Sequence, residues 1–219
     1  DYTIVGREAP RVDIPAKVRA QAVYVHDMRV PGMLHARVVR PPYPGRDGGA
    51  FVGACLLAVE RDSIAHLPGI VAVVVEGDFV GVVAEREEQA QRAMRALKVH
   101  WKAAPPLAPM DDLEARLREI PATRRELVRQ GDTTAALEAA SAVLQRTYVW
   151  PYQMHASIGP SCAVADWRAD GLTVWSGTQN PHVMRIDLAR LCELDEGCIE
   201  VVRMEGAGCY GRNCADDVG

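Results

Sequence analysis

The sequence predicts an α+β fold divided into two domains. Short apolar runs rich in β-branched residues, which favour strands, alternate with segments whose apolar residues recur at helical spacing. A proline-rich stretch, residues 103–109, separates two such groups, because clustered prolines resist both helices and central strands. The 219 residues suffice for two domains of common size, about 100 to 150 residues each. We therefore expect a first domain over residues 1–103 and the first part of a second, incomplete domain over residues 104–219.

The first domain is predicted to consist of strands packed against one main helix. This helix, residues 85–97, opens with acidic side chains that suit the positive end of a helix dipole. Its apolar residues form a single stripe, as in a helix that covers a sheet: Ala90, Ala93, Met94 and Leu97. A short helix is expected over residues 62–67, with Asp62 as its N-cap. The strands are expected at residues 22–26, 34–39, 54–59, 69–75, 79–84 and 99–101.

The second domain is predicted to contain both helices and strands, with an exposed polar connector at residues 123–131. Gln179 lies in a turn between a strand and a helix, where a side chain is held by rigid elements yet faces a crevice. Asn180 and Pro181 mark the start of that helix. The helices are expected at residues 111–119, 132–140 and 182–191, and the strands at residues 143–148, 161–167, 172–176 and 199–204.

The charge pattern argues against polymeric anionic partners. The formal net charge is -4, and acidic and basic residues are interspersed, which leaves no basic stripe for nucleic acid and no polybasic membrane patch. No apolar run approaches the roughly 20 residues that a membrane helix needs. We therefore expect neither nucleic-acid binding nor membrane insertion.

The six cysteines do not form a recognisable metal or disulfide framework. They contain no Cys-x2-Cys pair and no plant-type iron–sulfur spacing, so no cluster is predicted within this span. An apolar-rich chain does not need disulfide staples, and we expect most of the thiols to be reduced and buried. Cys209 and Cys214 flank a Gly-rich turn beside Arg212, and whether these two thiols are reactive stays open.

The Gly-rich turn over residues 206–213 is the strongest sign of a binding site. It follows an apolar run and carries Gly206, Gly208 and Gly211, whose missing Cβ atoms let a phosphate or a metal-bound oxygen approach main-chain N–H groups. The same glycines satisfy the dinucleotide fingerprint after a strand, but that fingerprint also requires a following helix and an acidic residue about 20 positions later. A plain nucleotide-binding domain is thus an alternative interpretation.

Together with two upstream segments, residues 152–165 and 175–182, the turn resembles the molybdenum-binding subunit of the xanthine oxidase family of molybdenum hydroxylases. The resemblance is to the branch of isoquinoline 1-oxidoreductase and nicotinate dehydrogenase, and to the N-terminal part of the subunit. Residues 10–18 and 31–42 look like the opening of that family's α/β hammerhead domain, so nearly the whole chain is covered. The resemblance implies a hammerhead over residues 1–103, followed by the start of a molybdopterin-binding domain.

The resemblance also implies a set of cofactor-binding residues. In this family the molybdopterin dithiolene holds the molybdenum, so the protein contributes hydrogen bonds to the centre and no metal ligand. The amide of Gln179 would donate to a metal oxo group, although this glutamine could instead cap the helix at Pro181. Asn213 takes the place of a substrate-binding carboxylate in some relatives, or caps a following helix. The implied cofactor-binding set is Gln179, Gly206, Ala207, Gly208, Cys209, Tyr210, Gly211 and Arg212.

The function implied by the resemblance is hydroxylation of an N-heteroaromatic ring or oxidation of an aldehyde, with water as the oxygen source. The cofactor would be molybdopterin in its cytosine dinucleotide form, and electrons would pass to iron–sulfur clusters on a small [2Fe-2S] subunit or a separate domain. The general-base glutamate is expected beyond residue 219, so this span should be inactive without the remainder of the molybdenum subunit. The alternatives are a non-catalytic assembly or cofactor-docking subunit and the nucleotide-binding domain. The compartment, cytoplasm or periplasm, stays open.

Overall fold

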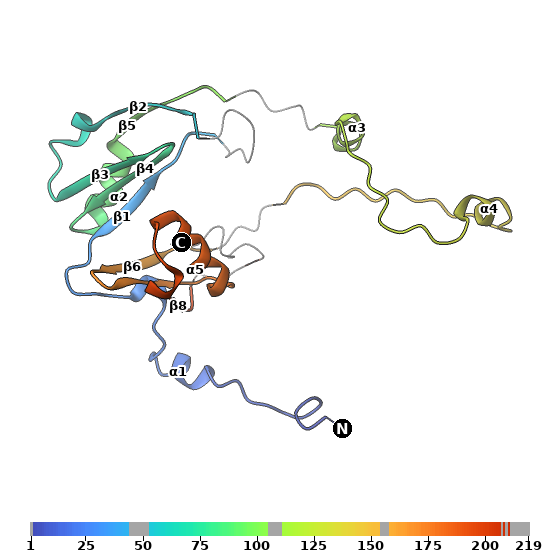
Figure 1. Ribbon diagram of the computed structural model, residues 1–219, viewed down its shortest axis with the longest axis horizontal. Coiled ribbons are helices and arrows are strands. Elements are labelled where there is room, and N and C mark those ends of the chain that lie inside the picture. The colour runs from blue at the N-terminus through green and yellow to red at the C-terminus, as the bar shows by residue number, and fades with distance from the viewer. Residues whose placement is uncertain are drawn as a thin grey trace. The chain divides into compact units, whose positions relative to one another are not determined.

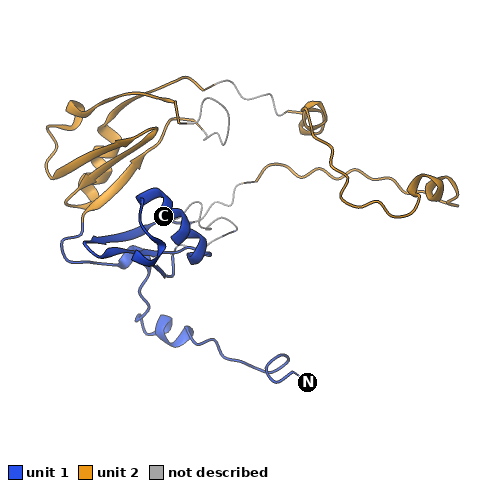
Figure 2. Cartoon of the chain, in the orientation of Figure 1, with its two compact units in different colours: residues 1–33, 154–219 blue, residues 34–153 orange. Residues whose placement is uncertain are grey.

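The computed structural model describes residues 2–43, 53–104, 111–153, 158–206, 208 and 210. Helices and small sheets are mixed along the chain, as the α+β prediction requires (Figure 1). The chain divides into two compact units, one of residues 1–33 with residues 154–219 and the other of residues 34–153 (Figure 2). The predicted boundary at residues 103 and 104 follows the proline-rich linker, whereas the two units are defined by contacts between segments that are far apart in the sequence. No helix within the described ranges is long and apolar enough to cross a bilayer.

The unit of residues 34–153 contains a three-stranded antiparallel sheet in the order β1-β4-β3. The strands are β1 (His35–Val39), β3 (Ile70–Glu76) and β4 (Phe79–Ala84). Strands β3 and β4 form a hairpin whose turn contains Gly77 at φ +55°, a conformation that glycine adopts without steric cost. The three predicted strands at these positions are confirmed to within one residue at every end.

A second, two-stranded sheet and a helix complete the core of this unit. Strand β2 (Leu56–Glu60) pairs antiparallel with β5 (Lys98–Trp101), and helix α2 (Glu87–Ala96) lies between β4 and β5 in sequence. The buried core residues come from β4, from α2 with its C-cap and from the short 3-10 helix η2 (Arg61–Ile64), and they are Ile64, Val80, Val82, Ala93 and Leu97. Partly buried side chains of β2 and β5 pack against them. The predicted capping role of Asp62 is wrong, because η2 starts one residue earlier and its N-cap, Glu60, makes no side-chain capping bond.

Asp78, in the β3–β4 turn, ties the hairpin to the start of β2. Its carboxylate accepts hydrogen bonds from the backbone N–H groups of Cys55 at 2.9 Å and Leu56 at 2.8 Å. The hydrogen bond with the Cys55 thiol, together with these backbone bonds, lowers the pKa of Asp78. The same contact raises the pKa of the Cys55 thiol, which is buried and therefore not poised for nucleophilic chemistry.

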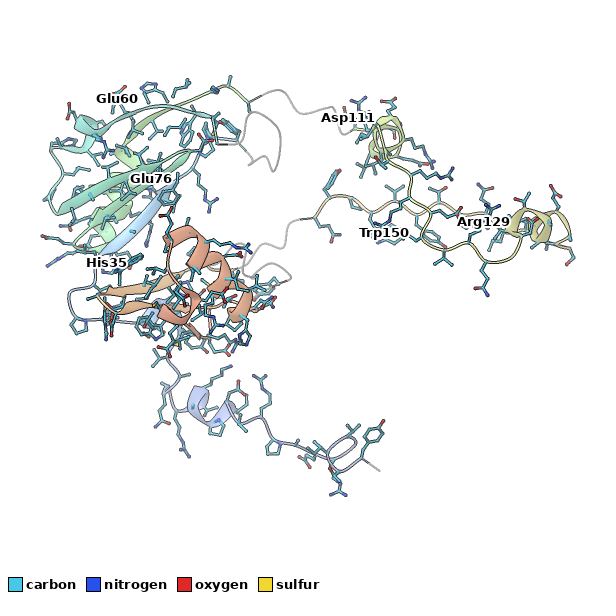
Figure 3. The ribbon with its side chains drawn as sticks, viewed as in Figure 1. His35, Glu60, Glu76, Asp111, Arg129 and Trp150 are labelled. Atoms are coloured by element: carbon cyan, nitrogen blue, oxygen red, sulfur yellow. The ribbon has the colours of Figure 1, made fainter. Side chains whose placement is uncertain are left out.

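Residues 111–153 form a segment that we term the exposed arm. It carries two short helices, α3 (Leu113–Glu119) and α4 (Thr133–Glu138), capped by Asp112 and Asp132, whose carboxylates accept from backbone N–H groups. The strand predicted at residues 143–148 is wrong, because no described strand pairs with these residues and they are exposed. Figure 3 shows the side chains along the arm, with Asp111, Arg129 and Trp150 labelled.

The other unit is built around the sheet β6-β7-β8. Strands β6 (Ala163–Arg168) and β7 (Gly171–Ser176) form an antiparallel hairpin, and β8 (Ile199–Arg203) pairs parallel with β7. The parallel pair requires a crossover, which is provided by helix α5 (Pro181–Cys192) and the 3-10 helix η3 (Glu196–Cys198). Helix and sheet share a buried core of Leu172, Val174, Met184, Ala189 and Ile199.

The N-terminal segment of this unit contains helix α1 (Ile14–Val18) and the 3-10 helix η1 (Val25–Asp27). The strand predicted at residues 22–26 is wrong. Tyr24 makes one isolated parallel bridge to Glu205, after which the chain turns into η1 and no ladder forms.

The expectation of mostly buried thiols is also wrong for the described cysteines, since Cys55 is buried, Cys162 and Cys192 are half-buried and Cys198 is exposed.

The bonds to Asp78 predict a pH-dependent contribution to stability. Because its pKa is lowered in the folded state, the carboxylate stabilises the unit above the ordinary aspartate pKa of about 4, and this stabilisation is lost as the pH falls through the lowered value. Asp78→Asn should lower the melting temperature near neutral pH and flatten its decline in acid, as measured by circular dichroism. Asp62→Asn, at an exposed carboxylate of η2, is the control. Equal acid slopes for Asp78→Asn and the wild type would contradict this prediction.

Candidate cofactor site

The parallel pair β7–β8 brings the two turns predicted to bind a cofactor to one edge of the sheet. Ser176 pairs with Arg203 at the ends of the two strands, and the N–H of Met204 donates to the carbonyl of Ser176 at 2.8 Å. Carboxyl ends of adjacent parallel strands are where ligands commonly bind in sheets crossed by helices. A Cβ built on Gly206 would lie 3.8 Å from the Cα of Gly177, so the main chains of the two turns are in close contact.

The first turn, residues 177–180, is held from both sides. Ser176 and Thr178 are completely buried. The Thr178 hydroxyl accepts from the N–H of Asn180 at 3.1 Å, and the Asn180 side chain accepts from the N–H of Val183 at 3.4 Å. Asn180 is therefore the residue that caps α5, which removes the capping role considered for Gln179. Gln179 is exposed between these two anchored neighbours, three residues after the end of β7.

The second turn follows β8 directly and exposes its main chain. Gly208 has φ +98° and is exposed, and Tyr210 has φ +50°. A Cβ on Gly208 would lie 2.7 Å from a ring carbon of Tyr210, so both the backbone conformation and the space favour glycine. Gly206 is half-buried. The remaining predicted site residues of this turn, Ala207, Cys209, Gly211, Arg212 and Asn213, lie outside the described residues.

The chemistry of this edge is that of neutral hydrogen-bond donors. An amide side chain and glycine main chain can donate to oxygens that carry negative charge, as outer groups around a metal centre do. Arg203 and Glu205, at the entrance of the second turn, form an ion pair of 2.9 Å that is half exposed. Within the described residues there is no group of three or more histidine, cysteine, aspartate or glutamate side chains that could hold a metal ion.

This arrangement fits a cofactor that brings its own metal ligands and needs only hydrogen bonds from the protein. The observation that carries the fit is Gly208, an exposed main-chain position at φ +98°, a conformation that favours glycine. The sequence predicted Gln179 from its place between a strand and a helix together with the family resemblance, and it predicted the glycines from the Gly-rich turn. It missed Thr178 and Val25, which support the two turns, because nothing in the sequence pattern distinguishes them from ordinary buried residues.

The comparisons with known proteins identify the family. Residues 118–216 match the family model described as the molybdopterin cofactor-binding domain. The chain is 61% identical to a subunit of nicotinate dehydrogenase from Pseudomonas putida over 219 residues, which is 100% of this chain and 18% of that protein. The chain belongs to the xanthine oxidase family of molybdenum hydroxylases. It is also 32% identical to the beta subunit of isoquinoline 1-oxidoreductase from Brevundimonas diminuta, over 83% of this chain and 24% of that protein.

The fold agrees with a solved structure of a family member. The crystal structure of quinoline 2-oxidoreductase from Pseudomonas putida 86 matches with a TM-score of 0.70 at 17% identity, over 95% of this chain and 31% of that one. At this identity the likeness concerns the fold alone. The chain spans less than a third of the length of each of these three relatives.

The geometry of the second turn predicts different tolerances at its first two glycines. Gly208→Ala should destabilise the folded chain by about 1 kcal/mol or more, because alanine is strained at positive φ and its methyl group would displace the Tyr210 ring. Gly206→Ala should cost less, since its Cβ would make only ordinary contacts at 3.8 Å. Urea unfolding of the two variants compares them directly. A larger loss for Gly206→Ala than for Gly208→Ala would contradict the described turn.

Proposed function

We propose that this chain is part of the molybdenum-binding subunit of a hydroxylase and contributes one wall of its cofactor site. The observation that carries the proposal is the meeting of Gln179 and the Gly206–Gly208 turn at one edge of the β7–β8 pair, in a chain that is 61% identical throughout to a nicotinate dehydrogenase subunit. The cofactor is molybdopterin, in its cytosine dinucleotide form. When bound it supplies a molybdenum centre that accepts two electrons from the substrate.

The residues of this chain would hold and orient that group through hydrogen bonds. Gln179 would donate from its amide, and N–H groups of the glycine-rich turn, which begins at Gly206, would donate to oxygens of the bound group, as the family resemblance implies. By the same resemblance, Asn213 is the proposed substrate-binding residue. Preorganised neutral donors of this kind stabilise charge on oxygen without first having to lose a tightly held water shell.

The reaction that we propose converts a ring C–H bond of an N-heteroaromatic compound into C–OH. Water supplies the oxygen, and the overall reaction releases two electrons and two protons, one proton from the ring C–H bond and one from the water. The electrons pass to iron–sulfur clusters on a small [2Fe-2S] subunit or a separate domain. The names of two relatives, which specify nicotinate and isoquinoline, favour a heteroaromatic ring over an aldehyde. The general-base glutamate belongs to the remainder of the subunit.

The exposed apolar side chains of the exposed arm are evidence that further protein packs against this chain. Its large apolar side chains include Val128 at 81% and Trp150 at 76% exposure, and burying such groups is a main source of stability in folded proteins. The described apolar residues of the arm that are exposed are Leu117, Ile120, Leu127, Val128, Leu137, Val143, Leu144, Tyr148, Val149, Trp150 and Tyr152. Extended apolar surface of this kind marks an interaction site. We propose that the remainder of the molybdenum subunit covers it.

For the domain organisation, we propose a hammerhead domain over residues 1–103 and the first part of the cofactor-binding domain over residues 104–219. The family match begins at residue 118, soon after the proline-rich linker, which supports this division. Segments on both sides of the linker then contribute to the unit that holds the cofactor edge, because residues 1–33 group with residues 154–219.

The proposal is tested by metal and pterin analysis of the purified assembly that contains this chain. Inductively coupled plasma mass spectrometry should find molybdenum, and fluorescence of the oxidised pterin should identify the cytosine dinucleotide form. The absence of both from a fully assembled sample would overturn the proposal in favour of a non-catalytic assembly subunit. Saturable NAD or ATP binding without a pterin would favour the nucleotide-binding alternative.

Gln179→Ala should lower kcat/KM of the assembled enzyme by about 10- to 100-fold, the range found when groups that orient a metal site are removed. The loss is expected because the variant removes an amide donor at the sheet edge while the Asn180 cap keeps α5 in place. Gln91→Ala, at an exposed amide on α2, is the matched control and should behave as the wild type. Wild-type kcat/KM in Gln179→Ala would exclude Gln179 from the site.

A further inference from the structure

The short segment around Val25 contacts the Gly-rich turn although the two lie at opposite ends of the sequence. The N–H of Val25 donates to the carbonyl of Glu205 at 2.9 Å, and Tyr24 forms a parallel bridge with Glu205. Glu205 is the residue immediately before Gly206. The backbone bond therefore fixes the chain at the point where it leaves β8 and enters the turn.

The side chain of Val25 packs beside Gly206 together with the end of β7. Val25 is 2% exposed. Its Cγ1 lies 3.8 Å from the position that a Cβ on Gly206 would occupy, the same distance as the Cα of Gly177. Gly206 thus lies near both the chain that leads from β7 to Gln179 and a Val25 methyl group. Side chains in such close packing transmit small displacements, because protein interiors have little free volume.

The Val25 segment is itself anchored, so it can act as a support. Within η1 the N–H of Asp27 donates to the carbonyl of Tyr24 at 2.9 Å. A ring nitrogen of His26 lies 2.9 Å from the carbonyl oxygen of Pro160, and η1 packs against β6. Figure 1 shows this blue segment beside the strands of its own unit. Hydrogen bonds on both sides of Val25 hold its backbone in place.

We propose that Val25 is a positioning residue for the cofactor turn. Its backbone N–H and its side chain set where Gly206 lies relative to Gly177, and through this contact they set the distance between the glycine main chain and the Gln179 amide. This inference rests on the proposed function, since it assigns the turn to the cofactor. It adds a residue from the N-terminal segment that neither the glycine motif nor the Gln179 motif includes.

The test compares Val25→Ala with Val23→Ala, a matched control at an exposed valine two positions earlier. Hydrogen exchange of the full chain is followed at the amides of Val25 and Met204, which bond to the carbonyls of Glu205 and Ser176. Loss of the methyl contacts should speed exchange at both amides by about tenfold, with little change at Val174 in the middle of β7. Val25→Ile, which keeps a methyl group at this position, should exchange more slowly at both amides than Val25→Ala.

A second measurement connects the contact with the cofactor. The molybdenum content of the assembled enzyme should fall severalfold in Val25→Ala and stay unchanged in Val23→Ala. Unchanged exchange at Val25 and Met204 would overturn the proposal and leave the proposed function standing. If exchange became faster by the same factor throughout β6, β7 and β8, Val25 would be an ordinary core residue, and the proposal would again be overturned. Faster local exchange with full molybdenum content would overturn the positioning role of Val25 and leave the proposed function standing.

Discussion

The parallel pairing of β7 with β8 is the constraint on which the candidate site depends. A parallel pair cannot be closed by a tight turn, so α5 must cross between the two strands, and the crossover places both strand ends at one edge. The hydrogen bond from Met204 to Ser176 continues the pairing one step past the last strand residue. Gln179 and Gly206 each follow the end of one of these two paired strands by only a few residues.

The supports of the two turns differ in kind. The first turn is fixed by polar groups, since Thr178 is completely buried and its hydroxyl accepts from Asn180, which in turn caps α5. The second turn is fixed mainly by packing and by one backbone bond, through Val25 and Gly177. Buried hydrogen bonds are directional and specify one geometry, whereas apolar contacts fix position only through shape. Both kinds of support keep Gln179 and Gly208 exposed at the sheet edge.

The unit of residues 34–153 contains none of the predicted cofactor residues and has its own core. Its core is closed by side chains from two sheets and α2, and the Asp78 carboxylate joins the β3–β4 hairpin to β2. The predicted cofactor residues belong instead to the unit of residues 1–33 and 154–219. The exposed arm that follows its sheets carries apolar side chains without a described core of their own, which is the pattern of a surface that becomes buried in a larger assembly.

The sequence by itself determined the elements whose signals are local. The strands around Val80 and Val174, the helix at residues 87–96 and the α5 start at Asn180 and Pro181 follow from β-branched content, apolar spacing and capping. The spacing of the glycines, and the place of Gln179 between a strand and a helix, also made these residues candidates. These properties are readable because each depends on neighbours a few positions away.

Only the tertiary structure decided what depends on partners far along the chain. Residues 22–26 and 143–148 have strand-like composition, yet a strand requires a neighbour to pair with, and among the described residues the first segment makes a single bridge and the second none. Val25 could not be predicted for the same reason, because its proposed role depends on a contact with Gly206 that the spacing of residues in the sequence does not show. Strand pairing and side-chain packing are non-local, so the fold, and not the pattern, places Val25 beside the glycine turn.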